Sequence, residues 1–315
     1  MGRRACGTLV AAATLTVAWS LTTTPVAGQA ATFERKSVCP DDDPAAFHRC
    51  ALEAGKTFTP PRTSDGRPDM SGYWRRRTQA FEDLEAHPRN ADDGGGPSAV
   101  VDPADGKVPM QPWADVRRRE NAAKYLHHNA ACLPAGAVPT MYMANLYQFL
   151  QTRDVFAIVG EGLSEHPFRS IPLDRSAPAG SKLQFYQGDS RGRWEGNTLV
   201  IETTNQNAKQ FLDQRGRFYT NEMRAVERLT MVDANTLHFQ AVIDDPNVFT
   251  RPFTIAYAFR RNTDPTAEVW EEACFEANAE QMQLFRNNGF QVYPGITGAE
   301  ARVLRQAWEA RETER

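Results

Sequence analysis

The sequence predicts a mainly β protein whose antiparallel meander closes into a barrel or strongly curved sheet (calycin-like), with peripheral N- and C-terminal helices. Successive strand patterns joined by short turns occupy residues 145–275, and helical periodicity appears on both sides of them. A long antiparallel sheet tends to curl, because closure removes exposed edges. The 315 residues, 41% of them hydrophobic, suffice for one large β-rich domain or two small ones.

Residues 1–30 have the pattern of a secretory signal peptide. Arg3 and Arg4 precede an apolar run from Leu9 to Leu21, and small residues follow it. That run of about 13 residues is shorter than the roughly 20 needed to cross a bilayer. We therefore expect a periplasmic or secreted protein with no membrane span after cleavage. An uncleaved anchor is the alternative.

Four cysteines lie beyond this leader, an even number that predicts two disulfides in an exported chain. Cys39 and Cys50 are close in sequence and flank a short predicted helix, so we pair them. Cys132 and Cys274 then close a long loop across the main domain. A thiol nucleophile or zinc site is disfavoured, because no CxxC motif is present.

The N-terminal parts precede the predicted sheet. Residues 31–60 form a disulfide-linked helical segment, with a helix from Pro44 to Ala54. Residues 61–130 form a Pro/Gly-rich excursion and a helix: 87–112 are predicted as a surface excursion, and Trp113–His128 as helical.

Residues 131–280 form the predicted antiparallel β domain. Hairpins are predicted over 147–159, 191–204, 224–243 and 253–274, with a further strand over 168–173. Residues 281–315 are predicted as C-terminal helices, since Thr297 and Glu300 have the capping-box pattern.

Composition and motifs exclude several functions. The net charge of −3 shows no basic excess, so we expect no nucleic-acid partner. No GxSxG, HExxH, P-loop or Rossmann-type GxGxxG motif appears. We therefore expect a small-molecule ligand or substrate, with no cofactor and no metal. The oligomeric state stays open.

Residues 188–205 hold the densest set of candidate site residues. Arg191, Arg193 and Glu195 alternate along one strand face, and Trp194 points to the other. In one interpretation Arg193 and Glu195 face a cavity. In the other, Trp194 closes one end of the barrel and the charges form cross-strand pairs outside.

Further candidates come from carboxylates and one histidine. Asp245 has two interpretations. It belongs to a turn before Pro246, or it acts with Glu227 as a general acid and base. Asn278 orients a ligand or caps a helix after Cys274. His127 and His128 are interpreted as surface residues. The candidate catalytic residues are Glu195, Glu227, Asp245 and His166; the candidate ligand-binding residues are Arg169, Asp189, Arg191, Arg193, Trp194, Arg228, Glu276 and Asn278.

Several ordered segments resemble a large group of exported bacterial proteins of unknown function, common in acidobacteria and proteobacteria. The similarity covers about residues 62–280 and rests on Gly66–Trp74, Cys132–Gly136, Phe168–Asp174, 188–205, Val226–Arg228 and Asp244–Pro246. The resemblance implies export and a β-rich structure, with no settled activity. Group members often have His directly after the cysteine that corresponds to Cys274, where this chain has Phe275. They also often have Gly-Arg-Pro-His after the residues that correspond to Leu173-Asp174, where this chain has Arg175–Pro178.

Two functions follow from these patterns. The first is a barrel that binds a small, partly apolar molecule, because barrel mouths are common ligand sites. The second is a cofactor-independent lyase, isomerase or hydrolase that uses paired Arg and carboxylate residues. A third interpretation is an envelope interaction module that uses Arg117–Arg119.

Overall fold

A computed structural model describes residues 36–91, 93–161, 168–174, 176–180, 182–270 and 273–314. The predicted leader and His166 lie outside the described residues. Within these ranges, every helix is too short or too polar to cross a bilayer.

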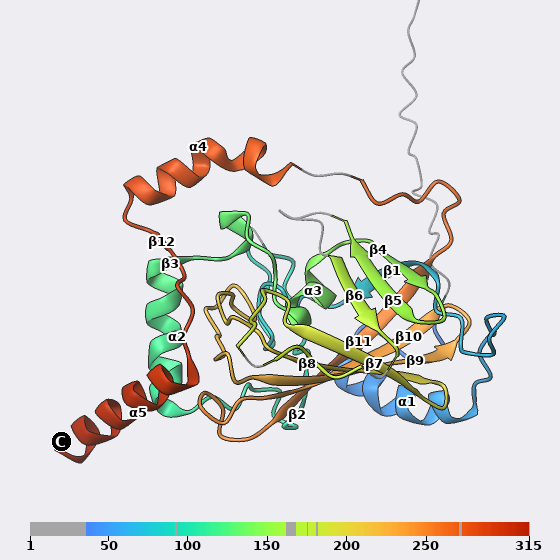
Figure 1. Cartoon of the computed structure of the whole chain (residues 1–315), viewed down its shortest axis with the longest axis horizontal. Helices are drawn as coiled ribbons and strands as arrows, with labels where there is room; N and C mark the ends of the chain where they lie inside the picture. Colours follow the sequence, from blue (N-terminus) through green and yellow to red (C-terminus); the bar gives the residue numbers. More distant parts are fainter. Residues whose placement is uncertain are drawn as a thin grey trace, which may run out of the picture. The chain divides into compact units, whose positions relative to one another are not determined.

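The protein is mainly β, with an antiparallel sheet that is nearly closed into a barrel (Figure 1). Nine strands follow the order β6-β5-β4-β1-β11-β10-β9-β8-β7, and β2 also pairs with β11. The strands are β1 (Gly72–Arg77), β2 (Val100–Asp102), β4 (Tyr147–Gln151), β5 (Val155–Gly160), β6 (Phe168–Pro172), β7 (Asp189–Glu195), β8 (Thr198–Thr204), β9 (Arg224–Asp233), β10 (Thr236–Asp244) and β11 (Phe253–Asn262). The predicted curled meander is confirmed.

Local turn chemistry explains the hairpins. Gly196 has φ +60°, the conformation that a tight turn between β7 and β8 needs and that glycine adopts without strain. The register then follows residue by residue, with Glu195 opposite Thr198 and Asp189 opposite Thr204. The three hairpins β4–β5, β7–β8 and β9–β10 agree with the predictions.

Alternation along the strands fills the inside of the barrel with side chains. On β9 the buried residues include Ala225, Glu227 and Leu229, while the residues between them are more exposed. The core is rich in fully buried rings: Trp74, Tyr147, Phe149, Phe156, Phe239, Tyr257 and Phe259. Their centroids lie 5.0–6.3 Å apart in the edge-on and tilted arrangements that aromatic pairs favour.

The two ends of the sheet, β6 and β7, meet at a seam without a described backbone ladder between them. Gly192 of β7 allows this approach. A Cβ at that position would lie 2.5 Å from Cδ2 of Leu173 and 2.9 Å from Cγ2 of Ile171. Side chains from the β6 end therefore occupy the space that any larger residue would need.

Helix α1 (Pro44–Thr57) packs outside the barrel, against β9 and β11. Phe47, Ala51 and Cys39 form a small apolar cluster with Val232 and Ala258, separate from the main core. The Asp43 carboxylate accepts hydrogen bonds from the backbone N–H groups of Ala45 and Ala46 at the start of the helix. The predicted helix is confirmed and runs past Gly55.

The remaining helices are α2 (Pro112–Lys124), the 3₁₀ turn η1 (Asn129–Ala131), α3 (Ala137–Met143), α4 (Cys274–Asn287) and α5 (Gly298–Thr313). The seven residues of α3 are all buried. The short strands β3 (Tyr125–Leu126) and β12 (Gln291–Val292) pair in parallel. Thr297 and Glu300 form the predicted capping box.

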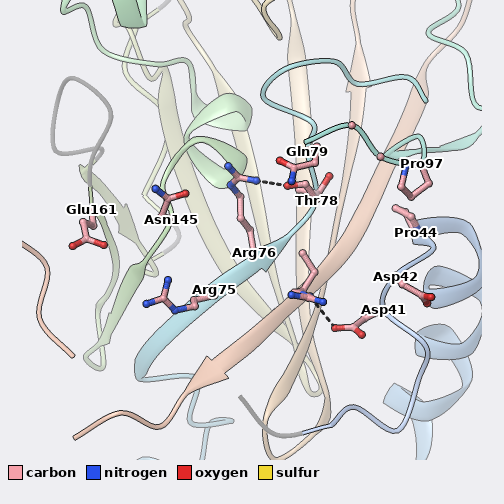
Figure 2. A pocket seen from close by; sticks show the side chains of 13 residues that line it. Asp41, Asp42, Pro44, Arg75, Arg76, Thr78, Gln79, Pro97, Asn145 and Glu161 are labelled. Carbon is pink, nitrogen blue, oxygen red and sulfur yellow. Dashed lines mark hydrogen bonds and ion pairs between the residues drawn. The ribbon is translucent and has the colours of Figure 1, made fainter. Parts of the chain in front are cut away.

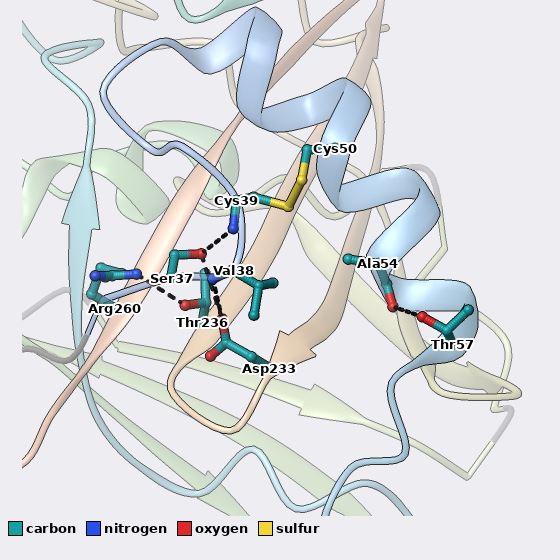
Figure 3. The surroundings of a disulfide bond; sticks show 9 residues. All are labelled: Ser37, Val38, Cys39, Cys50, Ala54, Thr57, Asp233, Thr236 and Arg260. Carbon is teal, nitrogen blue, oxygen red and sulfur yellow. Dashed lines mark hydrogen bonds between the residues drawn. A yellow bond between two sulfur atoms is a disulfide. The ribbon is translucent and has the colours of Figure 1, made fainter.

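Both predicted disulfides are present. Cys39 bonds to Cys50 within the N-terminal segment (Figure 3). Cys132 bonds to Cys274 at the start of α4. Two disulfides are typical of proteins that fold in an oxidising compartment outside the cytoplasm.

Several sequence predictions differ from the structure. The hairpin over 253–274 is wrong: β11 is a strand, but its neighbours are β1, β10 and β2, and Cys274 starts a helix. Residues 87–112 are more than a surface excursion, because β2 pairs with β11 and buries Val100. The helix predicted to reach His128 ends at Lys124. His128 is buried against Sδ of Met143 rather than on the surface.

Candidate functional site

A pocket of about 650 Å³ lies beside the end of β1, where β4 no longer pairs with it. Strand β4 pairs with β1 only along Gly72–Trp74, whereas β11 accompanies β1 to Arg77. Within the described strands, the stretch Arg75–Arg77 therefore has a ladder on one edge alone. We call this cavity the β1 pocket; its lining is Asp41, Asp42, Pro44, Arg75–Arg77, Thr78, Gln79, Gly95–Pro97, Asn145 and Glu161.

Arg76 forms part of the rigid wall of the β1 pocket. Its Nε donates to the backbone oxygen of Ala144 at 3.1 Å, and its Nη1 donates to the backbone oxygen of Thr78 (Figure 2). These bonds tie the loop before β4 to the end of β1. The Arg76 guanidinium therefore bonds to the protein backbone rather than pointing freely into the pocket.

Arg77 and Asp41 close another side of the β1 pocket. The Asp41 carboxylate lies 3.4 Å from Nε of Arg77 and 3.4 Å from Nε of Arg260. Arg260 is 7% exposed, so this contact connects the N-terminal segment to a buried position on β11. Asp41 therefore brings the segment before α1 into the pocket wall.

Arg75 is the cation that remains available. It is exposed, and within the described residues no carboxylate lies at ion-pair distance from it. In Figure 2 it lies on the same side of the β1 pocket as Asn145 and Glu161, with Gln79 and Pro97 on the other. The arrangement offers one guanidinium and two amides to a bound molecule.

Arg169 and Glu227 form a buried ion pair inside the barrel. Nη1 and Nη2 of Arg169 donate to the two carboxylate oxygens of Glu227 at 2.9 and 2.6 Å. Nη2 also donates to Oγ of Ser190 at 3.0 Å, and Nη1 donates to the backbone oxygen of Ala137 at 3.2 Å. Their side chains are 2% and 0% exposed, so the pair lies away from solvent.

The charged residues of 188–205 lie on the outer face. Glu195 pairs with Arg193 and with Arg228 of β9 at 2.8 Å, and Arg193 also pairs with Glu202. The hydrogen bond from Arg228 is the main cause that lowers the pKa of Glu195. Trp194 is partly buried against the core. This is the arrangement of the second interpretation, in which the charges pair outside the barrel.

Asp189 and Arg191 pair with each other on β7 at 3.1 Å. The carboxylate of Asp189 also accepts a hydrogen bond from the backbone N–H of Ala179. They therefore hold the loop before β7 against the barrel.

Asp245 organises the loop after β10. Its carboxylate accepts hydrogen bonds from the backbone N–H of Thr220 at 2.6 Å and of Asn247 at 3.1 Å. Burial raises its pKa, while these hydrogen bonds oppose the rise. Glu227 bonds to Arg169 instead, and within the described residues no hydrogen bond or ion pair joins Glu227 to Asp245.

Residues after Cys274 lie on helix α4. Glu276 is exposed in the first turn, and Ala273 occupies the N-cap position. The expected capping role of Asn278 is wrong, because the helix starts earlier and Asn278 lies within it. The side chain of Asn278 is outside the described part of the structure.

Arg75–Arg77, the arginine run that lines the β1 pocket, is not among the site residues predicted from the sequence. The available signal was a three-arginine run directly after Tyr73-Trp74, at the end of a strand pattern. The pairing of β1 with distant β11 gives that run its position, and such pairing leaves no local trace. Among the described residues, no group of three His, Cys, Asp or Glu side chains has an arrangement suited to a metal ion.

Comparison of the chain with protein-family models and with curated proteins found no match. The similarity to exported bacterial proteins therefore stays a prediction.

Proposed function

We propose that this protein binds a small, partly apolar molecule carrying one anionic group, and that the β1 pocket is the binding site. The exposed Arg75 guanidinium forms no ion pair within the described residues and has only a longer-range attraction to Asp264, and this is the observation that carries the proposal. The volume of about 650 Å³ falls within the roughly 300–1,000 Å³ of small-molecule sites. Export to the periplasm or medium is part of the same proposal.

The lining favours a monoanion over a more highly charged ligand. Arg75 presents a planar fork of donors that suits a carboxylate. Asp42 and Glu161 line the same pocket and would repel a second negative charge. Pro44 and Pro97 supply apolar surface for the rest of the molecule. A carboxylate with an apolar body and one donor group therefore fits best.

The test is isothermal titration at pH 7.5 with aromatic and aliphatic monocarboxylates, with the primary amides of the same acids as uncharged controls. We expect binding of at least one acid and more than tenfold weaker binding of its amide, because a charge-assisted hydrogen bond contributes about 1.5–3 kcal/mol.

Arg75→Gln should weaken that binding at least tenfold. Arg251→Gln is the matched control, since Arg251 is an exposed arginine paired with Asp102 and absent from the pocket lining. Equal affinity for acid and amide, or equal loss in the two variants, would overturn the assignment of the site.

A further inference from the structure

The N-terminal segment is cross-linked by its own disulfide and packs on the outside of the barrel. We call residues 36–57 the N-terminal lid. Its disulfide joins Cys39 to Cys50 within the lid, so it makes no covalent link to the barrel (Figure 3). Helix α1 ends at Thr57, and Phe58 packs against the main core. The chain thus has a junction at which the lid could separate as a unit.

Noncovalent contacts hold the lid in place. The backbone N–H of Val38 donates to the Asp233 carboxylate at 3.0 Å, and Asp41 lies beside Arg77 and Arg260. The small cluster around Phe47 adds apolar burial. The lid in turn supplies Asp41, Asp42 and Pro44 to the β1 pocket.

A pair of histidines joins the lid to the barrel at its centre. Nδ1 of His48 on α1 lies 2.9 Å from Nε2 of His238 on β10. One ring must donate the proton and the other must accept it, so the bond is lost when both rings are protonated. His238 is 3% exposed, and its ring makes a T-shaped contact with the Phe47 ring.

Burial, and then the charge of Arg49, lowers the pKa of His48 and so disfavours an added proton there. Arg49 follows His48 on α1, and Lys56 and Arg228 line the small cavity that His238 borders. Glu53 of α1 is paired with Lys56, and Arg228 of β9 with Glu195. Arg260 of β11 lies beside Asp41, and the Asp233 carboxylate accepts a hydrogen bond from Val38. These charged groups therefore interact with residues other than the two histidines.

We propose that the N-terminal lid separates from the barrel on acidification and thereby removes one wall of the β1 pocket. The role in ligand release rests on the proposed function, whereas the separation itself does not. Burial, and then repulsion from His48, lowers the pKa of His238 to about 3. An exposed histidine titrates near 6.5, so the separated lid is favoured about 30-fold more at pH 5.0 than at pH 7.5.

The test is hydrogen–deuterium exchange of the full mature chain without ligand at both pH values, corrected for intrinsic exchange rates. We expect protection of the α1 amides to fall about 30-fold at pH 5.0, while β9 and β10 stay protected. Unchanged protection of α1, or equal loss across the barrel, would overturn the proposal.

Two variants assign the effect to the histidine pair. His238→Gln and His48→Gln should each remove most of the pH dependence of α1 protection, because glutamine carries no charge. His127→Gln is the matched control: His127 contacts Phe81 and Phe211, away from the lid. A pH dependence that persists in both pair variants would contradict the proposal. Since no ligand is used, failure of carboxylate binding would not affect this result.

Discussion

Arg169 of β6 holds Glu227 of β9 with two hydrogen bonds, across the seam at which the barrel lacks a described backbone ladder. The same guanidinium binds Ser190 of β7. One buried side chain thus links three strands where the sheet ends meet. A specific polar contact therefore joins the two ends of the curved sheet.

Removal of the negative charge from this pair should strongly destabilise the protein. Glu227→Gln leaves the buried Arg169 without its counter-charge, and we expect a loss of about 3–5 kcal/mol in the free energy of unfolding. Urea denaturation measures this loss. Glu195→Gln is the control, because that pair is exposed and should cost at most about 1 kcal/mol. Similar losses in the two variants would show that the buried pair does not hold the seam.

Gly192→Ala should destabilise the seam from the other side. The added Cβ would overlap Leu173 and Ile171, and overpacking of this kind costs about 1–3 kcal/mol. Gly180→Ala provides a comparison, because no atom lies within 4 Å of its added Cβ. Thermal unfolding of the two variants gives the difference. A Gly192→Ala protein as stable as Gly180→Ala would contradict the close approach of β6 and β7.

The two disulfides should differ in their contribution to stability. Cys132 and Cys274 are separated by 142 positions and Cys39 and Cys50 by 11. In the chain-entropy model their loss costs about 5 and about 3 kcal/mol, respectively. Paired Cys→Ser variants in denaturant titrations test this order. A larger loss from the shorter loop would contradict the order.

Acid should lower the stability of the fold through His238. Its folded pKa, lowered to about 3 by burial, lies below the value of about 6.5 in an unfolded chain. The unfolded state therefore binds the proton first. Stability is complete above pH 6.5 and declines as the pH falls from there toward 3, by about 2 kcal/mol at pH 5.0. Urea denaturation of wild type and His238→Gln at pH 7.5 and 5.0 isolates this contribution to the free energy of unfolding. The same loss of free energy in both proteins on acidification would exclude it.

The hairpins could be read from the sequence because their information is local. Gly196-Asn197 and Ala234-Asn235 lie between strands that pair with each other, so a turn pattern and flanking alternation define each unit. The last hairpin prediction failed because residues 263–270 are not a strand. Strand β11 instead pairs with β1, nearly two hundred positions earlier in the chain.

The candidate site was less accessible to sequence analysis. The shared strand face of Arg191, Arg193 and Glu195 followed from alternation on β7. Whether that face met a cavity or solvent depended on which side of the sheet the core occupied. Arg75 lies beside the pocket because β4 pairs with β1 only as far as Trp74, and no local sequence pattern encodes that short pairing.

The sequence by itself indicated the curled antiparallel sheet, three of its hairpins and the terminal helices, because alternation and turn residues act over short stretches. The number and spacing of the cysteines indicated the disulfide partners. Tertiary structure alone decided the insertion of β1 between β4 and β11, the Arg169–Glu227 contact at the seam and the His48–His238 contact beneath the lid. Each of these joins residues far apart in the chain. Their pairing depends on how the whole sheet curls, which no short stretch of sequence specifies.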